Sequence, residues 1–116
     1  MNPFWLAEHL PELTRELDWA FREIGRDDLA DEVWETEIFE PCPCGADSCC
    51  TFYAIERDGK WRGRVERFFD LKVEGLICVF VVNGRIAGVE LFHRPDVSRQ
   101  LIRLFSYGFA DDDVEG

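Results

Sequence analysis

The sequence predicts an α+β domain with N-terminal helices, an antiparallel sheet of about four to five strands and a short C-terminal helix. Three observations support this prediction. Apolar residues recur at helical spacing over residues 13–24, a β-branched and aromatic run fills Leu76 to Val82, and Asn83-Gly84 follows that run as a hairpin turn. Because helices precede the strands instead of alternating with them, we expect them to cover one face of the sheet.

The N-terminal third of the chain has helical signals. Asn2-Pro3 predicts the start of a short first helix, since proline is favourable at the first helical position. A second helix is predicted from Pro11 to a stop at Gly25, and Asp27 or Asp28 is expected to cap one further turn. The second helix presents one apolar stripe, made of Leu13, Leu17, Ala20, Phe21 and Ile24.

Three segments then predict strands. Val33 to Glu40 alternates, with Trp34, Thr36 and Ile38 on one face, although a longer helix would also accept Val33 and Trp34. Pro41 and Pro43 are expected to end that element. The next strands are predicted over residues 50–56 and 63–71, joined by a turn at residues 58–59.

A β-hairpin and a final helix complete the predicted fold. The run Leu76 to Val82 is typical of a central strand, and residues 85–92 return as its partner, with Ile86 expected on the face opposite Val89. Pro95 is expected to begin the last helix, which ends at Gly108. Its buried stripe is predicted to contain Val97, Leu101, Leu104 and Phe105.

Length and charge limit the classes of function. The 116 residues suit one domain, expected over 1–110, followed by a disordered acidic tail at 111–116. The chain has 24 acidic and 13 basic side chains and a net charge of −11, which argues against binding nucleic acid or an anionic membrane. The same charge fits either plain solubility or an acidic face that docks a basic protein partner. Homo-oligomerisation stays open.

The N-terminal segment and the cysteines predict a cytoplasmic location. Residues 1–5 lack a basic signal-peptide region, and Glu8 and His9 interrupt any apolar run that follows. The chain has five cysteines, an odd number, so at least one thiol stays unpaired by any intrachain disulfide.

Four of these cysteines stand within residues 42–50 and form the candidate site. We expect Cys42, Cys44 and Cys49 to be zinc ligands, because thiolates bind zinc and Gly45 permits a tight turn between them. Cys50 is expected to be a core residue, since adjacent residues in a strand point to opposite faces. The fourth ligand stays open among Asp47, Cys78, His93, water and a second chain. Reduced thiols without metal and a disulfide remain alternatives, because the spacing lacks paired C-x2-C motifs.

The cysteine segment also carries a family resemblance. It spans residues 42–97 and rests on Cys42-x-Cys44-Gly45-x-Asp47-x-Cys49-x-Thr51-Phe52-Tyr53, on residues 83–86 and on residues 94–97. With these motifs the chain resembles a family of small bacterial proteins to which no activity is assigned. The resemblance implies that Cys42, Cys44 and Cys49 matter more than Cys50.

His93 and Arg94 form a second candidate site. Placed at a strand end beside a helix start, they could bind an anion. The simpler interpretation is that Asp96 caps the helix, Pro95 begins it and Arg94 is solvated.

Two functions follow from these features. The first is a small binding module, stabilised by zinc at the cysteine loop, whose acidic surface binds a basic protein partner as an immunity protein or antitoxin does. The alternative is a thiol- or zinc-dependent enzyme that uses the loop from Cys42 to Cys49. The first is favoured because no residues for proton transfer stand near the cysteines in the sequence.

Overall fold

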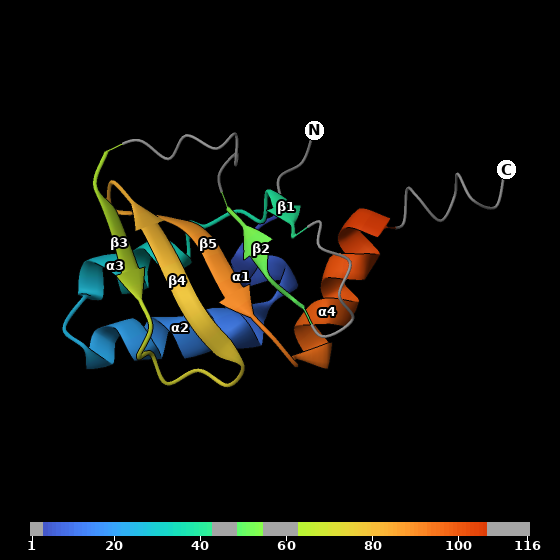
Figure 1. Cartoon of the computed structure of the whole chain (residues 1–116), viewed down its shortest axis with the longest axis horizontal. Coiled ribbons are helices and arrows are strands. Elements are labelled where there is room, and N and C mark those ends of the chain that lie inside the picture. Colours follow the sequence, from blue (N-terminus) through green and yellow to red (C-terminus); the bar gives the residue numbers. More distant parts are fainter. Residues whose placement is uncertain (1–3, 43–48, 55–62, 107–116) are drawn as a thin grey trace, which may run out of the picture.

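The structure is a computed structural model that describes residues 4–42, 49–54 and 63–106. Its elements in chain order are α1 (Leu6–His9), α2 (Pro11–Glu23), α3 (Asp27–Val33), β1 (Glu40–Pro41), β2 (Phe52–Tyr53), β3 (Val65–Phe68), β4 (Leu76–Val82), β5 (Arg85–Leu91), α4 (Pro95–Leu101) and the π-helix η1 (Ile102–Ser106). They form the predicted α+β fold (Figure 1). The predicted acidic tail lies outside the described residues.

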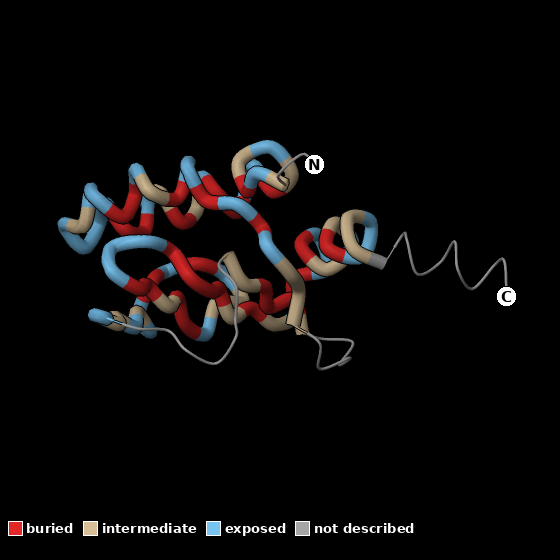
Figure 2. The backbone as a smooth tube through the Cα atoms, turned by 90° about the horizontal axis from the view of Figure 1, so that it is seen from above, coloured by how far each residue is buried: buried red, intermediate tan, exposed pale blue. Residues whose placement is uncertain are grey.

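The strands form one antiparallel sheet in the order β1-β2-β5-β4-β3. Helices α1, α2 and α3 lie together against one face of this sheet, and α4 lies near its β2 end (Figure 1). Seen from above, the helices and the sheet form two layers whose buried residues face each other (Figure 2). The prediction of one helix-covered face is therefore confirmed.

Helix α2 follows the predicted apolar stripe closely. Pro11 occupies its first position and Gly25 follows its end with a φ of 80°, a conformation that glycine adopts without steric cost. The stripe residues Leu13, Leu17, Ala20 and Phe21 are buried. Ile24 is the exception. The helix ends at Glu23, so Ile24 follows it as the C-cap residue, and it is 47% exposed.

The predicted strand over Val33 to Glu40 is wrong in its extent. Val33 ends α3, and only Glu40 belongs to a strand. The helix extends this far because Leu29, Ala30 and Val33, at offsets 0, 1 and 4, bury one helical face. The chain after α3 is extended. Thr36 and Ile38, which were predicted to share a face, are both buried there.

That extended segment pairs with the N-terminus instead of the centre of the sheet. The Leu6 N–H donates to the Thr36 carbonyl at 2.9 Å, and the Ile38 N–H donates to the Phe4 carbonyl at 2.7 Å. Strand β1 is short and forms an edge of the sheet, and it ends at Pro41, as predicted. Proline is tolerated there because an edge strand leaves one side unpaired.

The β4–β5 hairpin confirms the strongest prediction. Asn83 and Gly84 form a two-residue turn with φ angles of 53° and 80°, as a type I′ turn requires. The predicted faces are wrong in one detail: Ile86 lies in the core with Val89. The pairs Phe80↔Gly88 and Val81↔Ile86 leave Ala87 as an extra residue, and this β-bulge reverses the alternation.

The remaining elements are shorter than predicted. Strand β2 covers Phe52–Tyr53 and β3 covers Val65–Phe68, while the turn expected at residues 58–59 and the stop at Gly108 lie outside the described residues. Helix α4 begins at Pro95 as predicted and buries Val97 and Leu101. None of the helices in the described ranges is long and apolar enough to cross a membrane.

Candidate functional site

Two of the three predicted zinc ligands, Cys42 and Cys49, lie beside the short strands β1 and β2. The Cys42 N–H donates to the Thr51 carbonyl at 2.9 Å, and Cys49 forms a bridge with Phe92. Both cysteines are partly exposed. Cys44 lies outside the described residues. Within those residues, no three His, Cys, Asp or Glu side chains gather closely enough to hold a metal ion.

Two further cysteines belong to the packed interior. Cys50 is 1% exposed and Cys78 is fully buried, which confirms Cys50 as a core residue. Burial raises the pKa of both thiols because the thiolate loses its hydration. The Cys50 sulfur also accepts a hydrogen bond from the Arg94 N–H at 3.4 Å. Protonated, buried thiols are poor nucleophiles and poor metal ligands at neutral pH.

Arg94 corrects the prediction of a solvated side chain. It is 6% exposed, and its guanidinium donates to the carboxylates of Glu16 at 3.0 Å and Asp96 at 2.9 Å and to the Glu74 carbonyl at 2.8 Å. Asp96 does not cap α4, because it is the second residue of the helix and Arg94 holds the N-cap position. The bonds of the guanidinium connect α2, the turn before β4 and α4. Arg94 therefore has a structural role: its guanidinium donates hydrogen bonds to groups of the same chain and holds these three segments together.

The hydrogen bonds of Arg94 also bear on the anion site predicted at His93 and Arg94. His93 is exposed and has a φ of 60°, which turns the chain between β5 and α4. The Arg94 guanidinium is bound to two carboxylates and a carbonyl. Of the two residues predicted to bind an anion, only His93 therefore has a side chain that an anion could contact. The structure does not favour an anion site here.

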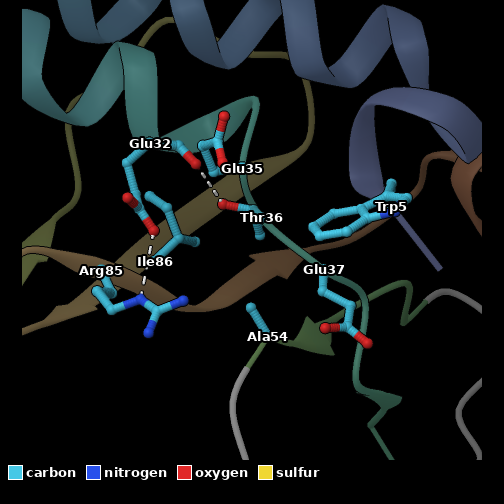
Figure 3. Close-up of a pocket in the computed structure, with 8 residues that line it drawn as sticks. All are labelled: Trp5, Glu32, Glu35, Thr36, Glu37, Ala54, Arg85 and Ile86. Atoms are coloured by element: carbon cyan, nitrogen blue, oxygen red, sulfur yellow. Dashed lines mark hydrogen bonds and ion pairs between the residues drawn. The ribbon is translucent and has the colours of Figure 1, made fainter. Parts of the chain in front are cut away.

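Among the described residues, a cleft of about 320 Å³ is a candidate site for binding a ligand. It lies between the end of α3, the extended segment after it, the start of β5 and the N-terminal segment (Figure 3). Its lining residues come from distant parts of the chain and are Trp5, Glu32, Glu35, Thr36, Glu37, Ala54, Arg85 and Ile86. Its volume lies near the lower end of the range of about 300–1,000 Å³ that is typical of small-molecule sites.

Backbone pairing fixes the frame of this cleft. Trp5 forms a bridge with Glu37, and the Thr36 hydroxyl donates to the Glu32 carbonyl at 2.8 Å. These contacts hold the segment after α3 against the N-terminus. Trp5 itself is 41% exposed, so its indole forms a wall of the cleft without being part of the core. Figure 3 shows Trp5 and Arg85 on opposite sides, with Ile86 beside Arg85 and Ala54 between Arg85 and Trp5.

The charge of the cleft is predominantly negative. Three glutamates line it, against the single guanidinium of Arg85. The Arg85 Nε lies 3.6 Å from a carboxylate oxygen of Glu32, and the Arg85 side chain remains 71% exposed. Such an exposed pair is weak, of the order of 0–1 kcal/mol. A cationic ligand is therefore the chemistry that the cleft accommodates best.

A second hollow of about 230 Å³ lies between the starts of α2 and α4. His9, Pro11 and Asp96 are among its lining residues. The Asp96 carboxylate is already paired with Arg94, and this hollow is smaller than the cleft beside Trp5.

Sequence reasoning missed the cleft. Its lining residues lie at positions 5, 32–37, 54 and 85–86, and no motif connects them. The available signal was the group Glu32, Glu35 and Glu37, of which the alternation predicted for Val33 to Glu40 placed Glu35 and Glu37 on the face opposite Thr36 and Ile38. Only the docking of the N-terminal segment beside residues 36–38 brings Trp5 to these carboxylates.

Comparisons with protein-family models, with curated proteins and with solved structures find no match for this chain.

Proposed function

We propose that the protein is a binding module whose acidic surface binds a basic protein partner, in the manner of an immunity protein or antitoxin. The observation that supports this most is the cleft beside Trp5, in which three glutamates and an exposed indole form one concave site. Concave, acidic and partly apolar sites suit partners that insert a basic side chain.

The charge of the whole chain supports the same proposal. A net charge of −11 on 116 residues attracts a basic partner that comes close and speeds its association. The same charge repels the phosphates of nucleic acids and anionic lipid headgroups, so neither is proposed as a partner. We also propose a cytoplasmic location, because the odd number of cysteines suits a reducing compartment.

The test of this proposal is binding to a fluorescent peptide of alternating arginine and glycine. The variant E32Q/E35Q/E37Q removes the carboxylates of the cleft and is expected to weaken binding about tenfold, since each exposed pair contributes up to about 1 kcal/mol. Higher salt is expected to weaken the binding of the unmodified protein further.

A matched control separates the cleft from bulk charge. The variant E23Q/D70N/E74Q removes three exposed carboxylates elsewhere on the surface, so its net charge equals that of the cleft variant. Binding by the control should stay within about threefold of the unmodified protein. Equal loss in both variants, or no binding by the unmodified protein, would contradict the proposal.

Zinc at the cysteine loop is a second part of the proposal. What supports it is that Cys42 and Cys49 are partly exposed at one end of the β1–β2 pair, whereas Cys50 and Cys78 are buried. The test is elemental analysis of protein purified without chelator, together with a count of free thiols. One zinc per chain, lost along with thermal stability in Cys44→Ser, is the expected result, because metal binding contributes to folding.

The same measurement addresses the alternative function. A structural zinc site has four protein ligands, whereas a catalytic site keeps three and an open position for water. Three cysteine ligands with one exchangeable water would favour a zinc-dependent enzyme. Five free thiols without metal would contradict both the zinc site and the zinc-dependent enzyme.

A further inference from the structure

We infer that the cleft beside Trp5 is a receptor for the guanidinium group of one arginine of the partner protein. This inference rests on the proposed function and assigns its central contact. The occupant is an arginine side chain of a basic polypeptide, and the residues that recognise it are Trp5, Glu35 and Glu37, with Glu32 shared between the ligand and Arg85.

The shape of the cleft suits one long side chain. Its volume of about 320 Å³ is bordered by segments from four parts of the chain, and Ala54 and Ile86 are the aliphatic residues of its lining. An arginine can lay its methylene groups against such residues while its charged end reaches the carboxylates. A nucleotide is disfavoured because its phosphates would lie beside three glutamates.

Arg85 shows the chemistry that the cleft accepts. Its guanidinium already lies 3.6 Å from the Glu32 carboxylate on one side of the cleft, yet its side chain is 71% exposed. A guanidinium is thus held loosely by one of the three carboxylates. Neither Glu35 nor Glu37 has an ion pair with any other residue that the structure describes. These two carboxylates are available to a second guanidinium.

Trp5 makes an arginine a better occupant than a lysine. Its indole faces the cleft from the side opposite Arg85 (Figure 3). A planar guanidinium can stack on the indole and still donate two parallel hydrogen bonds to a carboxylate, whereas an ammonium is a compact, strongly hydrated charge. An anion is disfavoured because three carboxylates surround the cleft.

The experiment uses a small probe, so that it does not depend on a larger partner. N-acetyl-arginine methylamide is titrated into ¹⁵N-labelled protein, and the indole and backbone N–H signals are followed by NMR. The indole signal of Trp5, identified by its loss in Trp5→Phe, is expected to shift saturably together with the backbone signal of Glu37. A single guanidinium contact should give a dissociation constant of the order of 1 mM.

Two further probes serve as controls: one lacks the positive charge, and the other has an ammonium in place of the guanidinium. N-acetyl-citrulline methylamide has nearly the shape of the arginine probe without its charge and is expected to cause no saturable shift. N-acetyl-lysine methylamide is expected to bind about two- to fivefold more weakly than the arginine probe. Equal shifts with the citrulline probe, or saturable shifts that avoid Trp5 and Glu37, would contradict the inference.

Variants with opposite expected effects make the test sharper. Glu37→Gln and Trp5→Leu should each weaken the binding of the arginine probe about two- to fivefold, because each removes one partner of the guanidinium. Arg85→Gln should strengthen the binding of the probe about two- to fivefold, because it removes the guanidinium that competes for Glu32. Weaker binding by Arg85→Gln would show that Arg85 helps to hold the ligand, and the inference would be wrong.

The outcome also separates this inference from the proposed function. If the arginine-glycine peptide binds but the single arginine probe leaves Trp5 unchanged, the protein is an acidic binding module whose cleft is not an arginine receptor. If neither binds, both proposals fail.

Discussion

Arg94 connects more of the fold than any other charged residue that the structure describes in detail. Its guanidinium reaches Glu16 on α2, Asp96 on α4 and the Glu74 carbonyl before β4, and its own N–H donates to the Cys50 sulfur. Buried charges of this kind are stable only when each donor finds an acceptor. The sequence suggested a solvated residue because it contains no signal that Glu16 lies nearby.

Replacing Arg94 by methionine should destabilise the protein by about 3 kcal/mol, because two carboxylates and a carbonyl lose their common partner. The measurement is the free energy of unfolding from urea denaturation. Arg99→Met is the control: Arg99 is an exposed arginine on α4, the helix that follows Arg94, and its loss should cost less than about 0.5 kcal/mol. A similar small effect for Arg94→Met would contradict the structural role.

The pairing of Arg94 with Asp96 also predicts a pH dependence. The hydrogen bond from Arg94 lowers the pKa of Asp96 below its ordinary value. The stabilisation is therefore complete above the unfolded pKa of about 3.9 and is lost as the pH falls through the folded pKa. Asp96→Asn should lower the melting temperature at about pH 6, and the difference from the unmodified protein should shrink as the pH falls below about 4.

The double variant R94M/D96N provides the check. If the pH dependence arises from this pair, Asp96→Asn should change little once Arg94 is absent. A difference that is constant with pH would show that the lowered pKa of Asp96 does not contribute.

Thiol reactivity should divide the described cysteines into two classes. In protein treated with a chelator, Cys42 and Cys49 are expected to react with Ellman's reagent in the folded state, because they are partly exposed. Cys50 and Cys78 should react only on unfolding, since burial raises their pKa. Cys42→Ser should remove one equivalent from the fast phase, and Cys78→Ser should leave that phase unchanged.

At the scale of elements, the connections carry as much information as the helices and strands. The turn at Asn83-Gly84 is set locally, by the tolerance of these residues for positive φ. The turn before β4 is set by its surroundings, because Gly75 lies against Phe92 and Arg94. The two glycines have nearly equal φ angles, 80° at Gly84 and 79° at Gly75, so they can be compared directly.

Substitution by alanine should separate these two glycines. Gly84→Ala should cost about 1–2 kcal/mol, from the backbone conformation alone, since an added Cβ meets nothing within 4 Å. Gly75→Ala should cost at least about 1–3 kcal/mol more, because its Cβ would lie 2.5 Å from the Phe92 carbonyl oxygen. Chemical denaturation measures both, and equal losses would show that the close approach at Gly75 relaxes without cost.

For the whole molecule, the excess of carboxylates governs encounters with other molecules. At about 0.15 M salt the field of the chain is screened beyond about 8 Å, so the charge acts on partners that come close. The protein should not bind a random DNA duplex or RNA hairpin under these conditions, because phosphate binding requires clustered basic residues. Fluorescence anisotropy with labelled oligonucleotides tests this, and sub-micromolar binding would contradict it.

The sequence by itself determined the local features of this protein. The amphipathic stripe of α2, the β4–β5 strands and their Asn83-Gly84 turn each depend on residues close together in the chain, and the structure confirms them. The order of these elements was also enough for the α+β class. The predicted cysteine site stays a prediction, because Cys44 lies outside the described residues.

Tertiary structure alone decided the extent of α3, the face of Ile86, the role of Arg94 and the cleft beside Trp5. The physical reason is the same in each case: the outcome depends on how one segment packs or pairs with another. Burial against α2 and the sheet extends α3, a bulge opposite β4 turns Ile86 inward, and Glu16, 78 residues away, buries Arg94. The cleft exists because the N-terminal segment pairs with the residues after α3, and no local pattern encodes that pairing.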